Sequence, residues 1–507
     1  MEIQEQVVRS IVEKVLHSYL GTSGGAGVTA EGGPALAAAA KFDAASARTY
    51  AAVPIVRPAS SVSEDEKNGI FSDMEKAIEA AENAHLALMQ MTLEKRREII
   101  RSVREIMLEN IDRLCEMAVR ETGMGNCRDK RVKNRLAILK TPGVEDLEPT
   151  AYTDDYGLTL IERSPYGVIG SITPSTNPTE TLICNGIGMA AGGNAVVFNP
   201  HPSAKETSNF TISLFNKAAA RAGGPVGLFS TIGNPTIESA QAMMKHPKIR
   251  LLVVTGGPAV VKAAMQSGKK VIAAGPGNPP CVVDETADID KAGKDIVNGA
   301  GLDNNIICIC EKEILAVDRI ADRLKDAMKE HGAYELNKNQ IDRVTGLVIQ
   351  DPGRPGHEGA PNKKYVGKEA SVIAADLGLS LPGDTRILLC EVPWDHPLVW
   401  TEQLMPVIPI VRMSSADEAI DFAVQCEHGF RHTASMHSKN IDNLSRMAKV
   451  MNCSVFVKNG PNYNGLGHEG PGFTSYTIAS PTGEGMTRAR TFTRERRCAL
   501  IGHFRIV

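Results

Sequence analysis

Short apolar segments alternate with helical segments through most of this chain, and this alternation limits the fold more than any other sequence feature. In the first series, residues 168–172, 195–198, 251–254 and 270–274 have the pattern of buried strands, and helical spacing occurs at 182–191 and 203–222. Strands that alternate with helices in this way form a parallel sheet with crossover connections. A second series extends from residue 306 to about residue 457. The sequence therefore predicts an α/β protein.

Composition limits the classes of function that are open to the chain. Its 507 residues are enough for two or three domains. The formal net charge of -3, from 56 Lys+Arg against 59 Asp+Glu, gives no general attraction to nucleic acid or to an anionic membrane. No apolar run approaches the ~20 residues that cross a bilayer. We therefore expect no nucleic-acid partner and no membrane partner.

The cysteines and the first residues indicate a cellular compartment. The ten cysteines are scattered, and only Cys308 and Cys310 lie close together, which is too few ligands for a structural zinc site. The N-terminus is acidic and amphipathic, unlike a secretory signal. We therefore expect a protein of the reducing cytoplasm, with free thiols and no bound metal.

The N-terminal residues form a separate piece of the chain. Residues 1–20 carry apolar side chains at helical spacing, which predicts an amphipathic helix. Residues 21–63 are rich in Gly, Ala, Ser and Pro, which predicts a flexible linker. A tethered helix cannot bury its apolar face against itself. It should therefore dock on a partner, or on its own domain or oligomer.

Other elements are predicted between this linker and the C-terminus. Residues 74–91 form a predicted helix with Ser72 and Glu75 as its capping box, and a long helical stretch follows Thr92. Residues 151–163 and 499–507 are strand-like.

Three polar or glycine-containing segments follow predicted strands. They are Thr173-Pro174 leading to Asn177, then Asn199-Pro200-His201, and then Thr255-Gly256-Gly257. Open α/β sheets bind ligands beyond the carboxyl ends of their strands, and glycines that precede a helix suit a phosphate. Each segment alone would be an ordinary strand-to-helix turn. Together they favour a nucleotide site, although the chain has no G-x-G-x-x-G at a strand end.

The segment Gly275-Pro276-Gly277-Asn278-Pro279-Pro280 lies between the two alternating series. It is too rigid and too rich in glycine for a generic linker. We interpret it as a place where the backbone approaches a ligand closely, and the alternative is a plain loop between domains.

The segment from Gly301 to Glu313 sets Cys308 behind a small polar turn, at the head of an apolar, strand-like run. A thiol at a loop-to-strand junction is exposed and rigidly aimed, as a covalent catalyst requires. The alternative is a small buried side chain without chemistry. The pattern alone does not distinguish Cys308 from Cys310.

These motifs occur in a specific order with three others, which are Thr401-Glu402-Gln-Leu-Met-Pro406, Glu427-His-Gly-Phe-Arg-His-Thr433 and Pro481-Thr-Gly-Glu-Gly485. From about residue 70 to the C-terminus, the chain resembles the aldehyde dehydrogenase superfamily. It is similar in particular to the CoA-acylating propionaldehyde and acetaldehyde dehydrogenases of bacterial microcompartments.

The resemblance implies an aldehyde dehydrogenase-like fold with three parts. Residues 64–150 and 164–281 would form a Rossmann-type cofactor domain, and residues 282–480 an α/β catalytic domain. Residues 151–163 and 488–507 would be β oligomerisation strands that pair between subunits in a homodimer or homotetramer.

The resemblance also implies roles for single residues. Cys308 would be the nucleophile, Asn177 the oxyanion-stabilising amide, and Glu402 the carboxylate that holds the nicotinamide ribose. The dinucleotide site would comprise Thr173, Pro174, Asn199, Pro200, His201, Thr255, Gly256, Gly257 and Gly275. The histidines His428, His432, His437 and His468 are interpreted as hydrogen-bonded or surface side chains. Pro481–Gly485 with Arg488 and Arg490 would border the acyl or CoA site.

Two departures from the hydrolytic members are informative. Those members carry a glutamate, the general base for water, where this chain has Ala273-Ala274. A thiol acceptor is far more acidic than water, so the loss favours transfer to coenzyme A. The second departure is Asn199-Pro-His201 in place of Lys-Pro-Ser, which leaves the choice between NAD and NADP open.

The predicted function is the oxidation of a short-chain aldehyde to its acyl-CoA, with NAD as cofactor and coenzyme A as co-substrate. A thioacyl group on Cys308 would be the intermediate. Microcompartment relatives often carry an N-terminal helix like residues 1–20, so the resemblance implies an enzyme that binds a shell protein inside a cytoplasmic microcompartment. The alternatives are a hydrolytic aldehyde dehydrogenase and a catalytically inactive scaffold that binds the shell.

Overall fold

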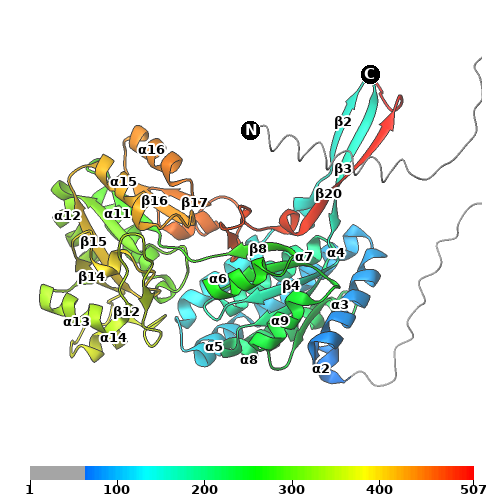
Figure 1. The fold of residues 1–507 in the computed structure, drawn as a ribbon, viewed down its shortest axis with the longest axis horizontal. Coiled ribbons are helices and arrows are strands. Elements are labelled where there is room, and N and C mark those ends of the chain that lie inside the picture. Colours follow the sequence, from blue (N-terminus) through cyan, green and yellow to red (C-terminus); the bar gives the residue numbers. More distant parts are fainter. Residues whose placement is uncertain (1–62) are drawn as a thin grey trace, which may run out of the picture. The chain divides into compact units, whose positions relative to one another are not determined.

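The computed structural model describes residues 63–507. The helix predicted for residues 1–20, and all of the predicted linker except residue 63, lie outside these residues. The described part contains two large parallel sheets and an antiparallel arm of three strands (Figure 1). This arrangement confirms the predicted α/β fold.

The first sheet has six strands, and every pairing in it is parallel. Across the sheet, the strands are β1 (Ile70–Phe71), β6 (Phe229–Ile232), β5 (Ala195–Pro200), β4 (Val168–Thr173), β7 (Ile249–Thr255) and β8 (Lys270–Ala274). The chain runs from β4 to β5 and β6 on one side, and then crosses back to β7 on the other side of β4. The carboxyl ends of β4 and β7 therefore border a topological switch point, where open α/β sheets bind ligands.

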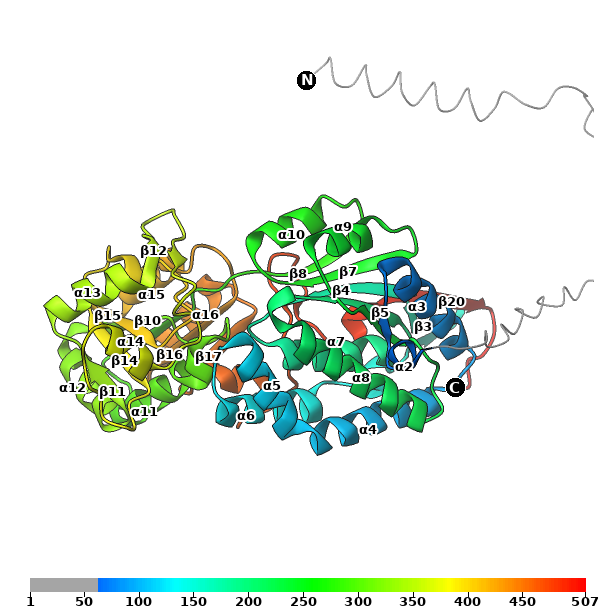
Figure 2. The same ribbon diagram turned by 90° about the horizontal axis from the view of Figure 1, so that it is seen from below.

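Helices cover both faces of this sheet. The helices α3 (Met74–Met89), α9 (Ile237–Lys245) and α10 (Pro258–Met265) lie on one face, and α4 (Leu93–Glu109), α7 (Pro178–Ala191) and α8 (Lys205–Arg221) lie on the other (Figure 2). Every residue of α7 is buried, because this helix packs between the sheet and further helices. Two of these further helices are α5 (Ile111–Thr122) and α6 (Cys127–Lys140). The short helix α2 (Glu64–Lys67) precedes β1.

The first helices differ in two details from the sequence prediction. The side chain that caps α3 is Asp73, which accepts a hydrogen bond from the Lys76 N–H over 2.9 Å, so the capping box of Ser72 and Glu75 was wrong. Thr92 begins a helix as predicted, but the long helical stretch is divided into α4 and α5. Asn110 ends α4 and precedes α5, and its amide donates to the Ile106 carbonyl over 2.9 Å.

The second sheet has seven strands, and it is also parallel throughout. Across this sheet, the strands are β11 (Ala333–Glu335), β14 (Ile387–Glu391), β15 (Val407–Met413), β10 (Glu313–Val317), β9 (Pro280–Val283), β16 (Thr433–His437) and β17 (Val455–Lys458). Successive side chains enter opposite cores: Val282 lies in one core, and its neighbours Cys281 and Val283 lie in the other.

Each of these cores is closed by its own helices. One is covered by α11 (Ile289–Ala300) and α12 (Asp318–Glu330), and the other by α13 (Lys338–Val348), α14 (Ala370–Asp376), α15 (Ala416–Cys426) and α16 (Ile441–Met451). Two short antiparallel pairs are β12 (Ile349–Asp351) with β13 (Ala360–Pro361), and β18 (Ile478–Ala479) with β19 (Gly485–Met486). The 3-10 turns are η2 (Val144–Leu147), η3 (Pro202–Ala204), η4 (Leu302–Asn305), η5 (Pro397–Val399), η6 (Asn462–Leu466) and η7 (Ala489–Phe492).

The arm contains β2 (Thr150–Asp154), β3 (Gly157–Pro165) and β20 (Thr493–Ile501) (Figure 1). The hairpin of β2 and β3 and the C-terminal strand pair with each other within one chain, whereas the resemblance implied pairing between subunits. The last strand also begins six residues before the predicted 499 and ends at residue 501, earlier than the predicted 507. All five residues of β2 are exposed, and so are the residues of β20 after Thr493.

Between residues 63 and 507, no helix is long and apolar enough to span a membrane. Within that range, no three His, Cys, Asp or Glu side chains are grouped in a way that would hold a metal ion.

Candidate active site

The strand-end residues singled out in the sequence lie at neighbouring positions of the first sheet. Thr173 ends β4 and is in register with Pro200 at the end of β5, and Thr255 ends β7. The Thr173 hydroxyl is buried and has no hydrogen-bond partner among residues 63–507. The structure therefore brings these residues together at the switch point, where a polar ligand would satisfy the Thr173 hydroxyl.

The flanking residues differ in how firmly they are held. The Asn199 amide oxygen accepts from the Ser239 hydroxyl over 2.6 Å, and His201 accepts from the Ser203 N–H over 3.2 Å. Gly257 caps α10, and a Cβ atom added to it would meet no atom within 4 Å. The backbone at the start of α10 is therefore open to a phosphate group.

The loop that carries Cys308 has an unusual backbone. Asp303, Asn304 and Asn305 all have positive φ angles, of 48°, 57° and 65°. Aspartate and asparagine tolerate the left-handed region better than other residues that carry a Cβ, which explains this run of residue types. The amide of Asn305 donates to the carbonyls of Ala300 (2.8 Å) and Glu311 (2.9 Å), and so holds the loop from both sides.

A buried lysine fixes the same loop from within. The Lys312 ammonium donates to the backbone carbonyls of Asn305 (2.9 Å) and Ile307 (3.2 Å). The strand-like run predicted to begin at Cys308 was wrong: residues 306–310 form turns and bends, residues 311 and 312 are irregular, and β10 begins at Glu313. The loop passes through the interior of the protein, so the apolar side chains of this run are buried. A sequence pattern cannot distinguish such a buried loop from a buried strand.

The structure separates the two neighbouring thiols. Cys308 is partly exposed, whereas Cys310 is fully buried and its sulfur lies 3.9 Å from the Leu302 carbonyl. Of the two, only Cys308 is accessible in this arrangement, which favours Cys308 over Cys310 as the reactive thiol.

Gly277 is the point at which three candidate residues meet. Its N–H donates to the Glu402 carboxylate over 3.3 Å. A Cβ atom added to Gly277 would lie 2.9 Å from the Cys308 carbonyl oxygen and 2.9 Å from Cγ of His432. The predicted approach of this segment to a ligand stays a prediction, and in the structure the backbone at Gly277 lies close to the cysteine loop and to a histidine.

Replacing Gly277 by alanine should displace the Cys308 loop, because neither neighbour is the far end of a flexible side chain. A misplacement of about 1 Å near reacting atoms lowers kcat by ~10²-fold, and overpacking a core destabilises a protein by ~1–3 kcal/mol. Steady-state kinetics and thermal melting would measure both effects. Gly346→Ala is the matched control, because a Cβ atom there meets nothing within 4 Å and Gly346 lies in α13. Wild-type kcat in Gly277→Ala would contradict the close packing.

The electrostatic surroundings of Cys308 oppose its ionisation. Burial and the Glu402 carboxylate raise the pKa of the Cys308 thiol to about 12, against the charges of Lys312 and Lys133. Burial also raises the pKa of Glu402 to about 7, partly offset by Lys312. In this state Cys308 is a thiol at neutral pH, and Glu402 is about half ionised.

These pKa values predict how iodoacetamide labels Cys308 in the free enzyme. Only the thiolate reacts, so the rate should rise ~tenfold per pH unit from pH 7 to 10 without a plateau. Glu402→Gln removes the negative charge and lowers the thiol pKa, so it should react several-fold faster than wild type above pH 8. Below pH 6 the two should agree, because Glu402 is then protonated. Mass spectrometry of the Cys308 peptide separates it from the other cysteines, and a plateau below pH 9 would contradict the raised pKa.

Asn177 lies at the amino end of α7 and is almost fully buried. Its amide oxygen accepts from the Lys133 ammonium over 2.7 Å, and its amide nitrogen lies 3.3 Å from the Thr176 hydroxyl. The sequence analysis missed Lys133, because its segment of α6 contains five Lys or Arg residues within nine positions and has the composition of a solvated helix. No local signal distinguishes it.

The histidines are only partly as expected. His428 makes a hydrogen bond to the Trp400 carbonyl over 3.0 Å. His432 is buried against Gly277 beside the Cys308 loop, and one ring nitrogen contacts the Thr433 hydroxyl at 2.8 Å. Its other nitrogen is without a partner within the described part of the chain. Burial and Lys312 lower the pKa of His432 to about 4, so this ring is neutral and next to the site, a position that the sequence did not predict.

The last predicted segments have different locations. The Thr482 hydroxyl accepts from the Ala273 N–H over 3.0 Å, and a Cβ atom on Gly275 would meet Pro481 at 2.8 Å. Pro481 and Thr482 thus border the end of β8. Arg488 and Arg490 are instead bound to Asp146 of η2, by an ion pair of 3.2 Å and a backbone hydrogen bond of 2.8 Å. These contacts give the two arginines a structural role.

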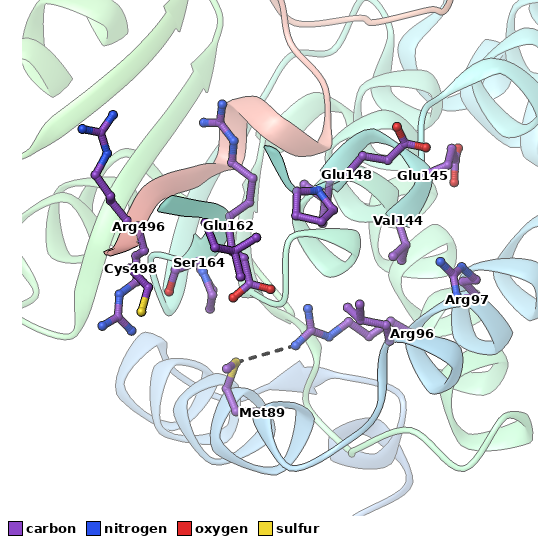
Figure 3. Close-up of a pocket in the computed structure, with 17 residues that line it drawn as sticks. Met89, Arg96, Arg97, Val144, Glu145, Glu148, Glu162, Ser164, Arg496 and Cys498 are labelled. Atoms are coloured by element: carbon purple, nitrogen blue, oxygen red, sulfur yellow. Dashed lines mark hydrogen bonds between the residues drawn. The ribbon is translucent and has the colours of Figure 1, made fainter. Parts of the chain in front are cut away.

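A cavity of about 680 Å³ lies elsewhere, where α3, α4 and η2 meet the arm (Figure 3). Its lining includes charged side chains of both signs, among them Arg96, Glu148, Glu162 and Arg496. None of the candidate catalytic or cofactor residues lines it. This cavity is therefore separate from the site around Cys308.

Several known proteins have sequences similar to that of this chain. The model of the aldehyde dehydrogenase family matches residues 48–346. An acetaldehyde dehydrogenase (acetylating) of Bilophila wadsworthia is 50% identical over 446 residues, which cover 87% of this chain and 91% of that protein. A propanal dehydrogenase (CoA-propanoylating) of Citrobacter freundii is 48% identical over 440 residues, covering 87% and 94%.

Solved structures of similar proteins agree with the fold. A propionaldehyde dehydrogenase of Rhodopseudomonas palustris, with bound CoA and an acylated cysteine, has a TM-score of 0.83 and 48% identity and covers 86% of this chain and 98% of its own. A propionaldehyde dehydrogenase from the fucose utilisation bacterial microcompartment of Clostridium phytofermentans has a TM-score of 0.84 and 48% identity, covering 87% and 100%. With the family model and close relatives each covering more than half of the sequence, the chain belongs to the aldehyde dehydrogenase family.

Proposed function

We propose that this enzyme oxidises a short-chain aldehyde to its acyl-CoA, with a nicotinamide dinucleotide as oxidant and coenzyme A as acyl acceptor. The carrying observation is the partly exposed Cys308 thiol in a site whose β8 end offers Ala273 and Ala274 in place of a carboxylate. A thioester formed there has no base on β8 to activate water, so it persists until a thiol collects the acyl group.

The chain's own residues have defined tasks in this reaction. The Cys308 thiol, protonated in the free enzyme, loses its proton to solvent, and the thiolate attacks the aldehyde carbon, forming a C–S bond and moving the carbonyl electron pair onto oxygen. The Asn177 amide and the Cys308 N–H donate hydrogen bonds to this oxyanion. When the carbonyl re-forms and hydride leaves, a thioester remains on Cys308. The CoA thiolate then attacks the thioester carbon, and the Cys308 thiolate is the leaving group.

The residues present fit a nicotinamide dinucleotide, which when bound supplies the acceptor for the hydride. The Thr173 hydroxyl, which has no partner among residues 63–507, and the open backbone at Gly257 lie at neighbouring strand ends, with Gly256 directly before Gly257. Thr173, Pro174, Asn199, Pro200, His201, Thr255 and Gly275 would complete the site, and Glu402 would hold the nicotinamide ribose. Asn199 provides no carboxylate, so NAD and NADP both remain candidates.

One assay tests the acyl acceptor. NADH formation should be followed with C2, C3 and C4 aldehydes, with and without CoA, and the acyl-CoA identified by chromatography. We expect at most a single turnover without CoA, and sustained turnover with ping-pong kinetics when CoA is present. Sustained formation of free acid without CoA would show a hydrolytic enzyme. An inactive scaffold would be favoured if no NADH forms and if aldehyde does not protect Cys308 from labelling by iodoacetamide.

We also propose that residues 1–20 bind a shell protein of a bacterial microcompartment. The support is their amphipathic sequence and the microcompartment origin of the Clostridium phytofermentans protein. Deletion of residues 1–20 should leave kcat within about twofold of wild type and abolish co-purification with shell proteins. Retained co-purification would contradict the proposal.

The arm is proposed to join subunits in a homodimer or homotetramer. Its exposed surface includes Tyr152 and Tyr156, and the apolar Ile501 of β20 is 73% exposed. An exposed strand edge with exposed apolar side chains is typical of a surface that a second copy of the same chain covers. Light scattering should return a dimer or tetramer mass, and a monomer would contradict this assembly.

A further inference from the structure

Helix α6 directs two lysines into the interior of the protein. The side chains of Lys130 and Lys133 are 0% and 1% exposed. Burying an ammonium group is costly unless it is paired and hydrogen-bonded. Their surroundings therefore have to supply both charge and acceptors, and the two lysines differ in what they receive.

Lys133 has three partners on different parts of the chain. Its ammonium lies 2.5 Å from Asp303, 3.3 Å from Glu180 and 2.7 Å from the amide oxygen of Asn177. Lys130 also pairs with Asp303, at 3.0 Å, but makes no contact with Asn177. Lys133 is thus the lysine that contacts the proposed oxyanion amide.

We propose that Lys133 is a positioning residue, which fixes the orientation of the Asn177 amide and couples it to the Cys308 loop through Asp303. This role rests on the proposed function, in which Asn177 donates to the oxyanion. An ammonium has only donors, so it can bind the amide oxygen but never the amide nitrogen. Lys133 thereby directs the Asn177 NH₂ group away from itself and excludes the flipped amide, whose oxygen would repel an oxyanion.

The location of Asn177 explains why such control is needed. Asn177 occupies the N-cap position of α7, where an asparagine usually accepts hydrogen bonds from the helix N–H groups. In this structure its side chain makes no capping hydrogen bond, and α7 begins with Pro178. Without Lys133, the amide oxygen is free to turn towards the N–H of Thr179 or Glu180. The NH₂ group would then leave the position from which it donates to substrate.

The same ammonium reaches the second oxyanion donor through Asp303. Asp303 begins the left-handed run that leads to Cys308, and its other carboxylate oxygen accepts from the Asn126 N–H over 2.8 Å. One buried charge therefore joins the segment that carries the amide to the loop that carries the Cys308 N–H. In addition, the charge of Lys133 lowers the pKa of Cys308, in the direction that favours the thiolate.

The test compares Lys133→Met with Lys130→Met. Both remove a buried ammonium from Asp303 and from the same helix, but only Lys133→Met releases Asn177. We expect kcat for CoA-dependent NADH formation to fall ~10²-fold in Lys133→Met, approaching the loss of one oxyanion donor, with KM for the aldehyde changed at most about threefold. Lys130→Met should keep kcat within about threefold of wild type.

A double-mutant cycle then separates positioning from a merely structural role. If Lys133 acts through Asn177, Lys133→Met should lower kcat at most about threefold further in an Asn177→Ala background. A full ~10²-fold loss in that background would overturn the proposal, as would equal kcat values in Lys133→Met and Lys130→Met. Thermal melting establishes that each variant is folded.

If Lys133→Met does not fold, Lys133→Arg is the variant that tests the proposal. It keeps a positive charge opposite Asp303 and Glu180, but its longer planar fork cannot place a donor at the same point. We expect at least about a tenfold loss of kcat in a folded protein, and wild-type kcat would overturn the proposal. Failure of the proposed function is distinguishable, because the wild-type enzyme would then form no NADH, or would form free acid without CoA, whatever the Lys133 variants do.

Discussion

Cys308→Ala should lose CoA-dependent oxidation of aldehydes, with a fall in kcat on the order of 10⁶-fold, the scale seen when a hydrolase loses its nucleophile. The reason is that no thioester can form, so the oxyanion donors have no intermediate to stabilise. Stopped-flow absorbance of NADH and mass spectrometry of the acylated enzyme would both measure the loss. The wild-type enzyme treated with aldehyde and NAD, without CoA, should gain one acyl group on the Cys308 peptide.

Cys310→Ala is the matched control for this change. Cys310 is fully buried, and its sulfur lies 3.9 Å from a backbone carbonyl, so the variant loses packing but no accessible thiol. We expect kcat within a few-fold of wild type and a lower melting temperature. If Cys308→Ala retained acyl-CoA formation while Cys310→Ala abolished it, the nucleophile would be wrongly assigned.

Asn177→Ala should lower kcat by ~10²–10³-fold, because it removes one of two hydrogen-bond donors to the oxyanion. The effect should appear in the step that forms the thioester, so the first turnover of NADH would slow by the same factor. The affinity for the dinucleotide, measured by calorimetry, should change little, since Asn177 acts on the reacting carbonyl.

Asn185→Ala is the control for the loss of a buried amide from the same helix. Asn185 is fully buried in α7, and its amide lies 3.3 Å from the Ser171 hydroxyl. Leaving that hydroxyl unpaired should cost ~1–3 kcal/mol of stability with little change in kcat. Equal kcat values in the two variants would contradict a specific role for Asn177.

Much of the fold was predictable because its strands and helices are regular. The strand predicted at residues 270–274 has the bounds of β8, and the residues flagged after β4, β5 and β7 do lie at one edge of the sheet. Both results follow from local patterns, since the carboxyl ends of parallel strands, and the turns that follow them, lie at the same edge of the sheet. The division at Asn110 was missed because this single residue separates two regular helices. The loop around Cys308 was missed because its apolar side chains are buried without regular structure.

The sequence by itself determined the α/β class, the strand ends that could bind a ligand, and the two thiols from which a nucleophile would come. Only the tertiary structure decided that Cys308 is the accessible thiol, that Gly277 must remain free of a side chain, and that Lys133 holds Asn177. These facts depend on residues far apart in the chain, such as Lys133, Asn177 and Asp303, meeting at one point. Local spacing records which residue types are present, but the burial of a charge and the direction of an amide are set by partners that only the folded chain brings together.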